Sequence, residues 1–296
     1  MTTAMTTVLK TVGLNKVYRL GDFLNRLRIN ALDEVNLNIE SEKPVIISLV
    51  GESGSGKTTL AKVMLRLVEP SSGQAIIYDQ LVAGDGAKPS KREILSTIQP
   101  IFQNPFEAFS AYRTVDAYLQ RTATRIKQLS KRDAVDAMDE ALVSVGLKYA
   151  DVKGKYPNQF SGGELQRVSV ARALIPRPKI IVADEPVSAL DVSIQSQIIN
   201  LLQDLQEQLN LTYLFIAHDL AVVEHISDNV AVMYLGRIVE YADRDSLYAN
   251  PMHPYTRALL SVVPVPNPRL RHKRIILSGE TPDPVNLPTG CRFHPR

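Results

Sequence analysis

The stretch Gly51-Glu52-Ser53-Gly54-Ser55-Gly56-Lys57-Thr58 fits the pattern G-x-x-x-x-G-K-S/T of a phosphate-binding loop. The apolar run 45–50 before it predicts a buried strand, and residues 59–68 after it predict a helix. A phosphate-binding loop requires this strand–loop–helix context. A glycine-rich turn that binds no ligand is the alternative, and the flanking strand and helix argue against it.

The chemistry of this loop follows from its residue types. Glycines let the backbone wrap closely, so that its N–H groups and the helix N-terminus point at the same oxyanions. We expect Lys57 to reach the outer phosphates of a nucleotide and the Thr58 hydroxyl to ligate Mg²⁺. The predicted nucleotide-binding residues of the loop are Gly51, Ser53, Gly54, Ser55, Gly56, Lys57, Thr58 and Thr59.

Composition limits the other classes of function. The 296 residues, 45% of them hydrophobic, suffice for one large α/β domain with or without a small appendage. A net charge of +3 is too small to predict a nucleic-acid partner. The single cysteine, Cys291, excludes an internal disulfide and fits a reducing compartment. No apolar run approaches the roughly 20 residues that span a bilayer. If the protein acts at a membrane, we therefore expect other chains to span it.

Patterning along the chain predicts a mixed architecture. Residues 8–18 and 29–39 predict two antiparallel strands, which we expect to flank the phosphate-loop strand. Residues 83–90 predict a loop. From 115 to 146 glycine and proline nearly vanish and apolar residues recur at helical spacing, which predicts a helical insertion. Residues 230–234 and 237–241, separated by a leucine and a glycine, predict a hairpin.

An α/β pattern resumes after the insertion. The run 180–183 is too apolar to have a wet face and predicts a central parallel strand. A helix over 194–209 and a strand over 213–217 follow it. The expected fold class is therefore α/β: a mostly parallel P-loop NTPase core with an antiparallel β subdomain, an inserted helical subdomain and a small C-terminal module.

Acidic and polar residues stand where the predicted strands end. Asp184 and Glu185 follow a buried strand, where a carboxylate can ligate Mg²⁺ and a second can polarise water. Phosphoryl transfer needs positioning, charge neutralisation and an oriented water, and Glu185 is the candidate for the last role. Gln103 and His218 end two other predicted strands. The alternatives are solvated strand-end acids, a polar amide and an ordinary histidine.

Together these segments resemble the ATP-binding-cassette (ABC) family, in the family's order over residues 8–242. The matching segments are Tyr18, the phosphate loop, Gln103, Ser161-Gly162-Gly163-Glu164-Leu165-Gln166, Asp184-Glu185-Pro186, Ser188-Ala189-Leu190-Asp191 and His218. The resemblance implies that Tyr18 stacks on adenine, that Gln103 touches Mg²⁺ or the attacking water, and that His218 contacts the γ-phosphate. It makes Thr58, Gln103 and Asp184 the magnesium ligands, Asp184 through water, and places Asp191 in the nucleotide site.

The segment 161–166, called the signature segment here, implies a partner. A serine hydroxyl and glycine N–H groups at a helix N-terminus form an anion site. In the resembling family, Ser161, Gly162 and Gly163 would hold the γ-phosphate of ATP bound to a second cassette subunit. Leucine and glutamine are usual where this chain has Phe160 and Glu164. A glutamate facing two triphosphates would repel them. Because Ser161 and both glycines are present, we expect Glu164 to weaken the action of the signature segment rather than abolish it.

The C-terminal residues point to one branch of the family. Residues 250–256, 278–284 and 290–296 resemble the end of the oligopeptide and dipeptide importer ATPases, and of the second of their two ATPase subunits. The expected organisation is a nucleotide-binding domain over 1–249, with a helical subdomain over about 104–165, and a C-terminal module over 250–296, possibly truncated. Some members bind an iron–sulfur cluster through four cysteines there; with only Cys291 we expect none.

The expected function is to bind and hydrolyse ATP, with Mg²⁺, as the subunit that energises a membrane importer. The resemblance implies a second ABC ATPase subunit, different or identical, two transmembrane permease subunits, and an extracellular solute-binding protein acting through the permease. It implies peripheral location on the cytoplasmic face of the membrane and no nucleic acid. Oligopeptides or dipeptides are the favoured solute, with sugars or nickel as alternatives; a soluble ABC ATPase of translation or DNA maintenance is less favoured. We expect truncation at Asn250 to leave ATP binding intact, since every nucleotide motif precedes it.

Overall fold

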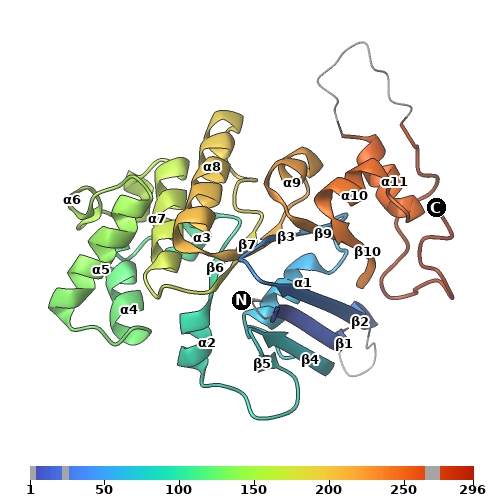
Figure 1. Cartoon of the computed structure of the whole chain (residues 1–296), viewed down its shortest axis with the longest axis horizontal. Helices are drawn as coiled ribbons and strands as arrows, with labels where there is room; N and C mark the ends of the chain where they lie inside the picture. The colour runs from blue at the N-terminus through green and yellow to red at the C-terminus, as the bar shows by residue number, and fades with distance from the viewer. Residues whose placement is uncertain (1–4, 22–26, 264–273) are drawn as a thin grey trace. The chain divides into compact units, whose positions relative to one another are not determined.

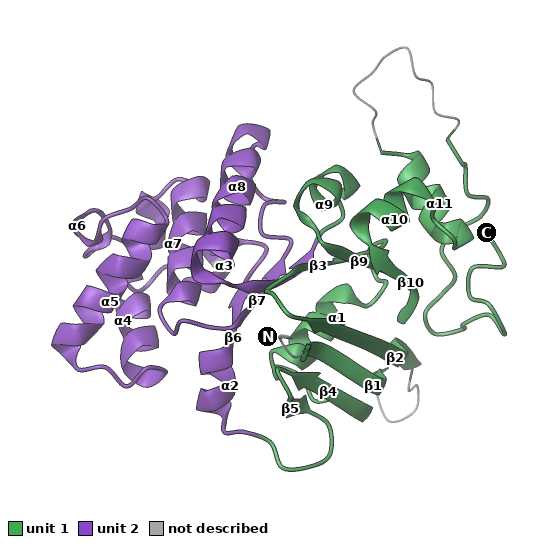
Figure 2. Cartoon of the chain, viewed as in Figure 1, with its two compact units in different colours: residues 1–88, 217–296 green, residues 89–216 purple. Residues whose placement is uncertain are grey.

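The computed structural model describes residues 5–21, 27–263 and 274–296 (Figure 1). The chain divides into two compact units (Figure 2). Residues 1–88 together with 217–296 form unit 1, and residues 89–216 form unit 2.

Unit 1 contains an antiparallel sheet of order β2-β1-β4-β5. Along β2, Val35, Leu37 and Ile39 are buried and alternate with exposed residues, so one face of the strand lies on the core and the other meets water. The strands are β1 (Thr6–Leu20), β2 (Leu27–Ser41), β4 (Ser72–Ile77) and β5 (Gln80–Ala83). The antiparallel pairing of the first two segments is confirmed.

The phosphate-loop strand has different neighbours from those predicted. Every residue of β3 (Ile46–Val50) is buried, and it pairs in parallel with β9 (Asn229–Tyr234), which is buried from Val230 onward. The prediction that β1 and β2 flank β3 is wrong, because those strands form a separate sheet. A strand buried on both faces requires a neighbour of the same kind, which β2 with its exposed positions is not. The predicted hairpin of β9 with β10 (Arg237–Asp243) is confirmed.

Four helices complete the described part of unit 1. They are α1 (Lys57–Met64), α9 (Leu220–Ile226), α10 (Arg244–Ala249) and α11 (Pro254–Ser261). The last of these belongs to the C-terminal region, and its Tyr255, Thr256 and Ala258 are buried. The region from 254 to 261 therefore packs into unit 1 rather than lying on its surface.

Unit 2 combines parallel strands with a helical segment. Strands β6 (Ile98–Ile101), β7 (Ile180–Asp184) and β8 (Thr212–Ile216) are neighbours in that order, and both pairs are parallel. Helices α4 and α5 pack on each other, and α5 packs on α7. The helices are α2 (Lys91–Thr97), α3 (Pro105–Ala108), α4 (Val115–Arg125), α5 (Lys131–Ser144), α6 (Tyr149–Val152), the 3-10 turn η1 (Pro157–Gln159), α7 (Gly162–Leu174) and α8 (Val192–Leu209).

Strand β5 and helix α2 are among the elements that the sequence pattern does not predict. Strand β5 returns antiparallel to β4 after Tyr78 and Asp79, which both have positive φ angles of 46° and 59°. Helix α2 begins at a capping box in which Ser90 accepts from the Glu93 backbone and the Glu93 carboxylate accepts from the Ser90 backbone. The S-x-x-E pattern is the available signal for α2. Parallel strands in both units, with the separate antiparallel sheet and the helices, agree with the predicted α/β class.

Candidate nucleotide-binding and hydrolysis site

The phosphate loop lies in unit 1, between the end of β3 and the start of α1. Gly56 is the N-cap of α1 in the left-handed conformation, with φ 108°, and no side chain caps this helix. The first N–H groups of an uncapped helix attract anions, and the helix dipole adds positive potential there. Thr58 and Ser53 are exposed, whereas Ser55 and Lys57 are buried.

The glycines of the loop allow a close approach of other backbone segments. A Cβ atom on Gly51 would lie 2.1 Å from the Met233 carbonyl oxygen, and one on Gly56 would lie 2.5 Å from the Ala31 carbonyl oxygen. These distances are shorter than any real Cβ contact, so a side chain at either position would displace backbone. The loop is thus held between β9 and β2, both of unit 1.

Lys57 has its ammonium turned back along the loop. Its Nζ donates to the carbonyl oxygens of Gly51 and Glu52, each at 2.8 Å, and to Ser55 Oγ at 3.2 Å. A buried cation needs such compensating partners. Its charge lies at the helix N-terminus, where phosphate oxygens are expected to bind.

Two more predicted residues lie in unit 1. His218 is exposed and comes directly before Asp219, the N-cap of α9. Tyr18 lies near the end of β1, opposite Ile29 of β2, and is half-buried. Lys16 Nζ lies 5.1 Å from the centroid of the Tyr18 ring, which is a cation–π distance.

The two adjacent carboxylates lie in unit 2, at the carboxyl end of β7. Asp184 is the last residue of the strand and pairs with Ile216 of β8. Glu185 has φ 46°, a left-handed conformation that is rare for a residue with a side chain. Its N–H donates to the Ile216 carbonyl oxygen at 2.9 Å, which ties the turn to β8. Backbone strain of this kind gathers at functional sites.

The structure brings Gln103 and Glu185 together, 82 residues apart in sequence. Gln103 Nε2 donates to Glu185 Oε2 at 2.9 Å. The amide therefore orients the carboxylate that sequence reasoning selects for polarising water. Both side chains belong to unit 2, Gln103 just beyond the end of β6.

Gln166 has no individual role in the sequence-based predictions. It is fully buried on α7, and its Nε2 donates to the Pro186 carbonyl oxygen at 2.7 Å. This hydrogen bond ties helix α7 to the turn that carries Glu185. The signal in the sequence is its place as the last residue of the signature segment.

The signature segment forms the N-terminus of α7, as predicted. Ser161 is the N-cap, and its Oγ accepts from the Glu164 backbone N–H. The Glu164 carboxylate in turn accepts from the Ser161 N–H and hydroxyl, each at 2.8 Å. Hydrogen bonds from the Ser161 backbone and then its side chain lower the pKa of Glu164 below its ordinary value. Glu164 is thus turned toward the cap of its own helix.

The two glycines after Ser161 lie close to side chains of the segment 190–194. A Cβ atom on Gly163 would lie 2.7 Å from Ile194 Cγ2, and one on Gly162 would lie 3.3 Å from Leu190 Cδ2. The N-terminus of α7 therefore packs closely against the segment that leads into α8. Asp191 is the N-cap of α8 and is exposed.

The donor types suit the expected ligands. Hydroxyl, amide and carboxylate oxygens are the ligands that Mg²⁺ prefers, and Thr58, Gln103 and Asp184 supply one of each. Among the described residues no group of three or more His, Cys, Asp or Glu side chains is placed to hold a metal ion. A site built from one carboxylate, one hydroxyl and nucleotide phosphates needs no such group.

Within the described ranges, no helix combines the length and the apolar character needed to cross a bilayer.

Comparison with known proteins gives two family matches. The family model described as ABC transporter matches residues 32–188, and the one described as oligopeptide/dipeptide transporter, C-terminal region, matches residues 239–296. The oligopeptide transport ATP-binding protein AppF of Bacillus subtilis is 44% identical over 270 residues, covering 90% of this chain and 81% of that protein. The dipeptide transport ATP-binding protein DppF of Haemophilus influenzae is 41% identical over 295 residues, covering 98% and 88%.

A solved structure agrees with these relatives. The dimeric ATP-binding cassette MJ0796, in a post-hydrolysis state with ADP and Pi bound, superposes with a TM-score of 0.69 at 27% identity. The match covers 80% of this chain and 99% of that one, which confirms the predicted fold class. This chain therefore belongs to the ABC transporter family of ATP-binding cassettes and carries the C-terminal region of its oligopeptide/dipeptide branch.

Proposed function

We propose that this chain binds and hydrolyses ATP as an energising subunit of a membrane importer for oligopeptides or dipeptides. The observation that carries the proposal is that one chain matches the ABC transporter family model over residues 32–188 and the oligopeptide/dipeptide transporter C-terminal region over residues 239–296. One relative is an oligopeptide transport ATP-binding protein and another is a dipeptide transport ATP-binding protein. Their names support peptides, rather than sugars or nickel, as the transported solute.

In this proposal the phosphate loop and its helix bind the triphosphate. The N–H groups at the start of α1 donate to phosphate oxygens, and Lys57 neutralises charge on the outer phosphates. Tyr18 stacks on the adenine. Mg²⁺, held by Thr58, Gln103 and Asp184, supplies charge neutralisation when it is bound with the nucleotide.

Glu185 acts on the attacking water. Its carboxylate accepts a hydrogen bond from the water and then its proton, as the water oxygen bonds to the γ-phosphorus. The bond from the γ-phosphorus to the bridging oxygen breaks, its electron pair stays with ADP, and inorganic phosphate results. Gln103 holds the carboxylate in place through the 2.9 Å hydrogen bond, and His218 contacts the γ-phosphate.

The assembly follows from the signature segment. Ser161, Gly162 and Gly163 cap the γ-phosphate of ATP bound to a second cassette subunit, so ATP binding closes the pair and phosphate release opens it. The solved MJ0796 structure is a dimer of cassettes, which supports this pairing. We propose that the partner is a related but different ATPase subunit, that two permease subunits span the membrane, and that this chain lies on the cytoplasmic face. A solute-binding protein delivers the peptide to the permease.

The substitution Glu185→Gln tests the catalytic assignment. It should leave ATP affinity of the full chain within about twofold and lower ATP hydrolysis by the assembled complex by about 100-fold or more, the range for loss of a general base. Asp204→Asn, an exposed acid on α8, is the matched control and should change neither quantity. Hydrolysis that survives Glu185→Gln undiminished, while the control behaves like the parent, would remove Glu185 from the mechanism.

A further inference from the structure

The second residue of the phosphate loop is contacted by the C-terminal region. The Glu52 backbone N–H donates to the Tyr255 hydroxyl oxygen at 2.8 Å. The Glu52 carboxylate accepts from Arg296 Nη1 at 3.0 Å and 2.8 Å, and from Thr281 Oγ1 at 3.0 Å. All four residues belong to unit 1, and the three partners lie more than 200 positions after Glu52 in the sequence. No nucleotide motif of the chain includes Tyr255, Thr281 or Arg296.

Tyr255 is rigidly held. It is completely buried, its ring centroid lies 4.5 Å from that of Tyr234 and 5.6 Å from that of Phe293, and its backbone N–H is capped by His253 Nδ1 at 3.1 Å. A side chain packed on two aromatic rings keeps one rotamer. Its hydroxyl is therefore a fixed acceptor for the loop.

The Glu52–Arg296 ion pair is partly shielded from water. The Arg296 side chain is 10% exposed and the Glu52 side chain is 28% exposed. Arg296 Nη1 also donates to Thr281 Oγ1 at 3.2 Å, so three side chains form one cluster. A shielded pair with extra hydrogen bonds is screened less than a surface pair and is costly to break by removing one partner.

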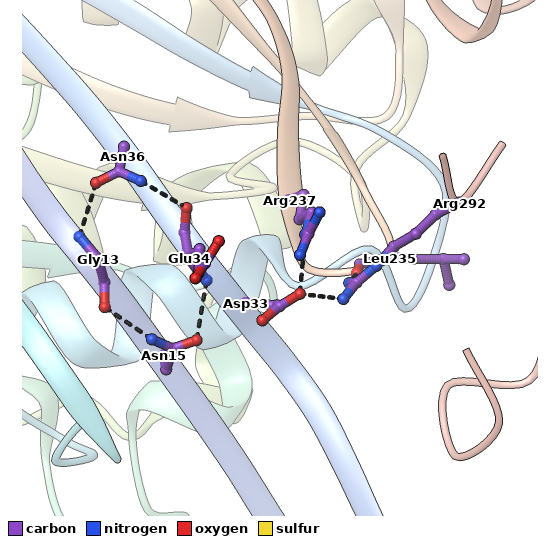
Figure 3. A network of polar contacts seen from close by, with 8 residues as sticks. All are labelled: Gly13, Asn15, Asp33, Glu34, Asn36, Leu235, Arg237 and Arg292. Carbon is purple, nitrogen blue, oxygen red and sulfur yellow. Dashed lines mark hydrogen bonds and ion pairs between the residues drawn. The ribbon is translucent and has the colours of Figure 1, made fainter. Parts of the chain in front are cut away.

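A second route links the same region to the loop. Arg292 donates to the Leu235 carbonyl oxygen and pairs with Asp33, on which Arg237 also converges at 2.8 Å (Figure 3). Gly236, which follows Leu235 in the β9–β10 turn, donates its N–H to the Ser55 carbonyl oxygen at 2.8 Å. The β9–β10 turn therefore connects Arg292 to the loop on the Ser55 side.

These contacts reach Lys57, the residue proposed to bind the outer phosphates. Glu52 is tied to Tyr255 through its N–H, and its carbonyl oxygen is an acceptor of Lys57 Nζ. A shift of Glu52 would move an acceptor of the Lys57 ammonium and change how the loop presents that charge.

We propose that the C-terminal region braces the phosphate loop, with Tyr255 and Arg296 as positioning residues that set the affinity for ATP. The proposal rests on the function proposed above for the loop. A preorganised loop spends no binding free energy on ordering itself, so releasing it weakens nucleotide binding. This replaces the expectation that the region after Asn250 is independent of ATP binding.

The first test is Tyr255→Phe in the full chain, with Tyr248→Phe as matched control. Both remove one tyrosine hydroxyl that makes a hydrogen bond in unit 1, but the Tyr248 hydroxyl donates to the Leu220 carbonyl oxygen instead of accepting from the loop. Titration with a fluorescent ATP analogue should show affinity about two- to tenfold weaker for Tyr255→Phe, the range for one hydrogen bond, and unchanged for the control. In the assembled complex KM should rise by a similar factor while kcat stays within about twofold.

The second test is a double-mutant cycle of Glu52→Gln and Arg296→Gln. If the pair acts as one brace, the double variant loses no more affinity than Arg296→Gln alone. Arg257→Gln is the control, because the exposed Arg257 donates to the Pro251 carbonyl oxygen and does not touch the loop. Thermal unfolding of each variant separates loss of the brace from loss of the fold.

The outcomes separate this proposal from the function it rests on. If the parent binds the analogue and both Tyr255→Phe and Arg296→Gln bind it equally well, the brace is overturned and the ATPase function stands. A loss of affinity shared equally by Tyr248→Phe and Arg257→Gln also overturns it, because the effect would then be general. A parent chain that binds no nucleotide would overturn the proposed function itself.

Discussion

The cap of α7 puts a charged carboxylate beside the hydroxyl proposed to bind a phosphate. Glu164 accepts from both the N–H and the hydroxyl of Ser161, and the resulting depression of its pKa keeps it ionised at neutral pH. A hydroxyl that donates to this carboxylate has to release it before it can donate to a γ-phosphate. We therefore expect Glu164 to oppose ATP-dependent pairing of two cassettes, through competition for the hydroxyl and through its negative charge.

Replacing Glu164 with Gln should strengthen that pairing. Glutamine keeps the reach of the capping box and removes the negative charge. The ATP concentration for half-maximal hydrolysis by the assembled complex should fall about two- to fivefold, as expected for one charge at a helix terminus. ATP affinity of the separate chain should not change, because its own phosphate loop is untouched. A half-maximal concentration that rises or stays constant would show that Glu164 does not act on the pairing.

At the scale of single residues, the sequence indicated which residue types could take part in the site, but it did not show how their side chains are oriented. Strand-end positions selected Gln103 and Glu185, and the structure joins them by a hydrogen bond. The S-x-x-E spacing around Ser161 contained the capping box, but the residue pattern alone did not show that Glu164 turns back on its own helix. The Gln166–Pro186 contact needed tertiary structure, since nothing local distinguishes this glutamine from other buried polar residues.

Helix α11 carries Tyr255, one of the two positioning residues of the proposed brace, and its N-cap is the titratable residue His253. His253 is its N-cap, and Nδ1 accepts from the Tyr255 N–H only while that nitrogen is unprotonated. Burial lowers the pKa of His253, although the neighbouring Glu240 carboxylate acts in the opposite direction. Burial acts to raise the pKa of Glu240, but the hydrogen bonds it accepts, including those from the Met252 and His253 N–H groups, lower it overall, so Glu240 stays ionised at mildly acidic pH.

The cap of α11 should weaken on acidification. Because the folded-state pKa of His253 is below the unfolded value of about 6.5, its contribution is present above that pH and is lost as pH falls toward the folded pKa. Hydrogen-exchange protection of the α11 amides should fall between about pH 7.5 and 5.5, by at most about tenfold per pH unit. His253→Asn keeps a capping acceptor without a titrating group and should flatten the profile. Equal profiles for the two chains would contradict the assignment.

Helices and strands with strong periodicity could be predicted from the sequence, but the pairing of strands far apart in the sequence could not. The hairpin of β9 and β10 and the long helix α8 follow from alternation, turn residues and helical spacing. The partner of β3 did not, because pairing between strands distant in sequence leaves no local signal, and β9 lies about 180 residues later. Helix α2 is seven residues long, too short for its periodicity to be recognised.

At the scale of the whole chain, the nucleotide motifs are shared between both units and the C-terminal region belongs to one of them. Unit 1 holds the phosphate loop, His218 and the brace, and unit 2 holds Gln103, Glu185 and the signature segment. The contacts from Tyr255 and Arg296 to Glu52 link a region without nucleotide motifs to the phosphate loop, which is the basis of the proposed brace. Motifs alone could not predict this, since the brace uses ordinary residue types.

The most direct test of the central claim is to identify what this chain binds in its own cells. The tagged full chain would be recovered from gently extracted membranes and its companions identified by mass spectrometry. We predict two multi-spanning permease subunits and a second cassette ATPase in the purified complex, with a peptide-binding protein associated with them. Recovery from the soluble fraction with ribosomes or DNA, and without a permease, would contradict the importer function and leave only the ATPase chemistry.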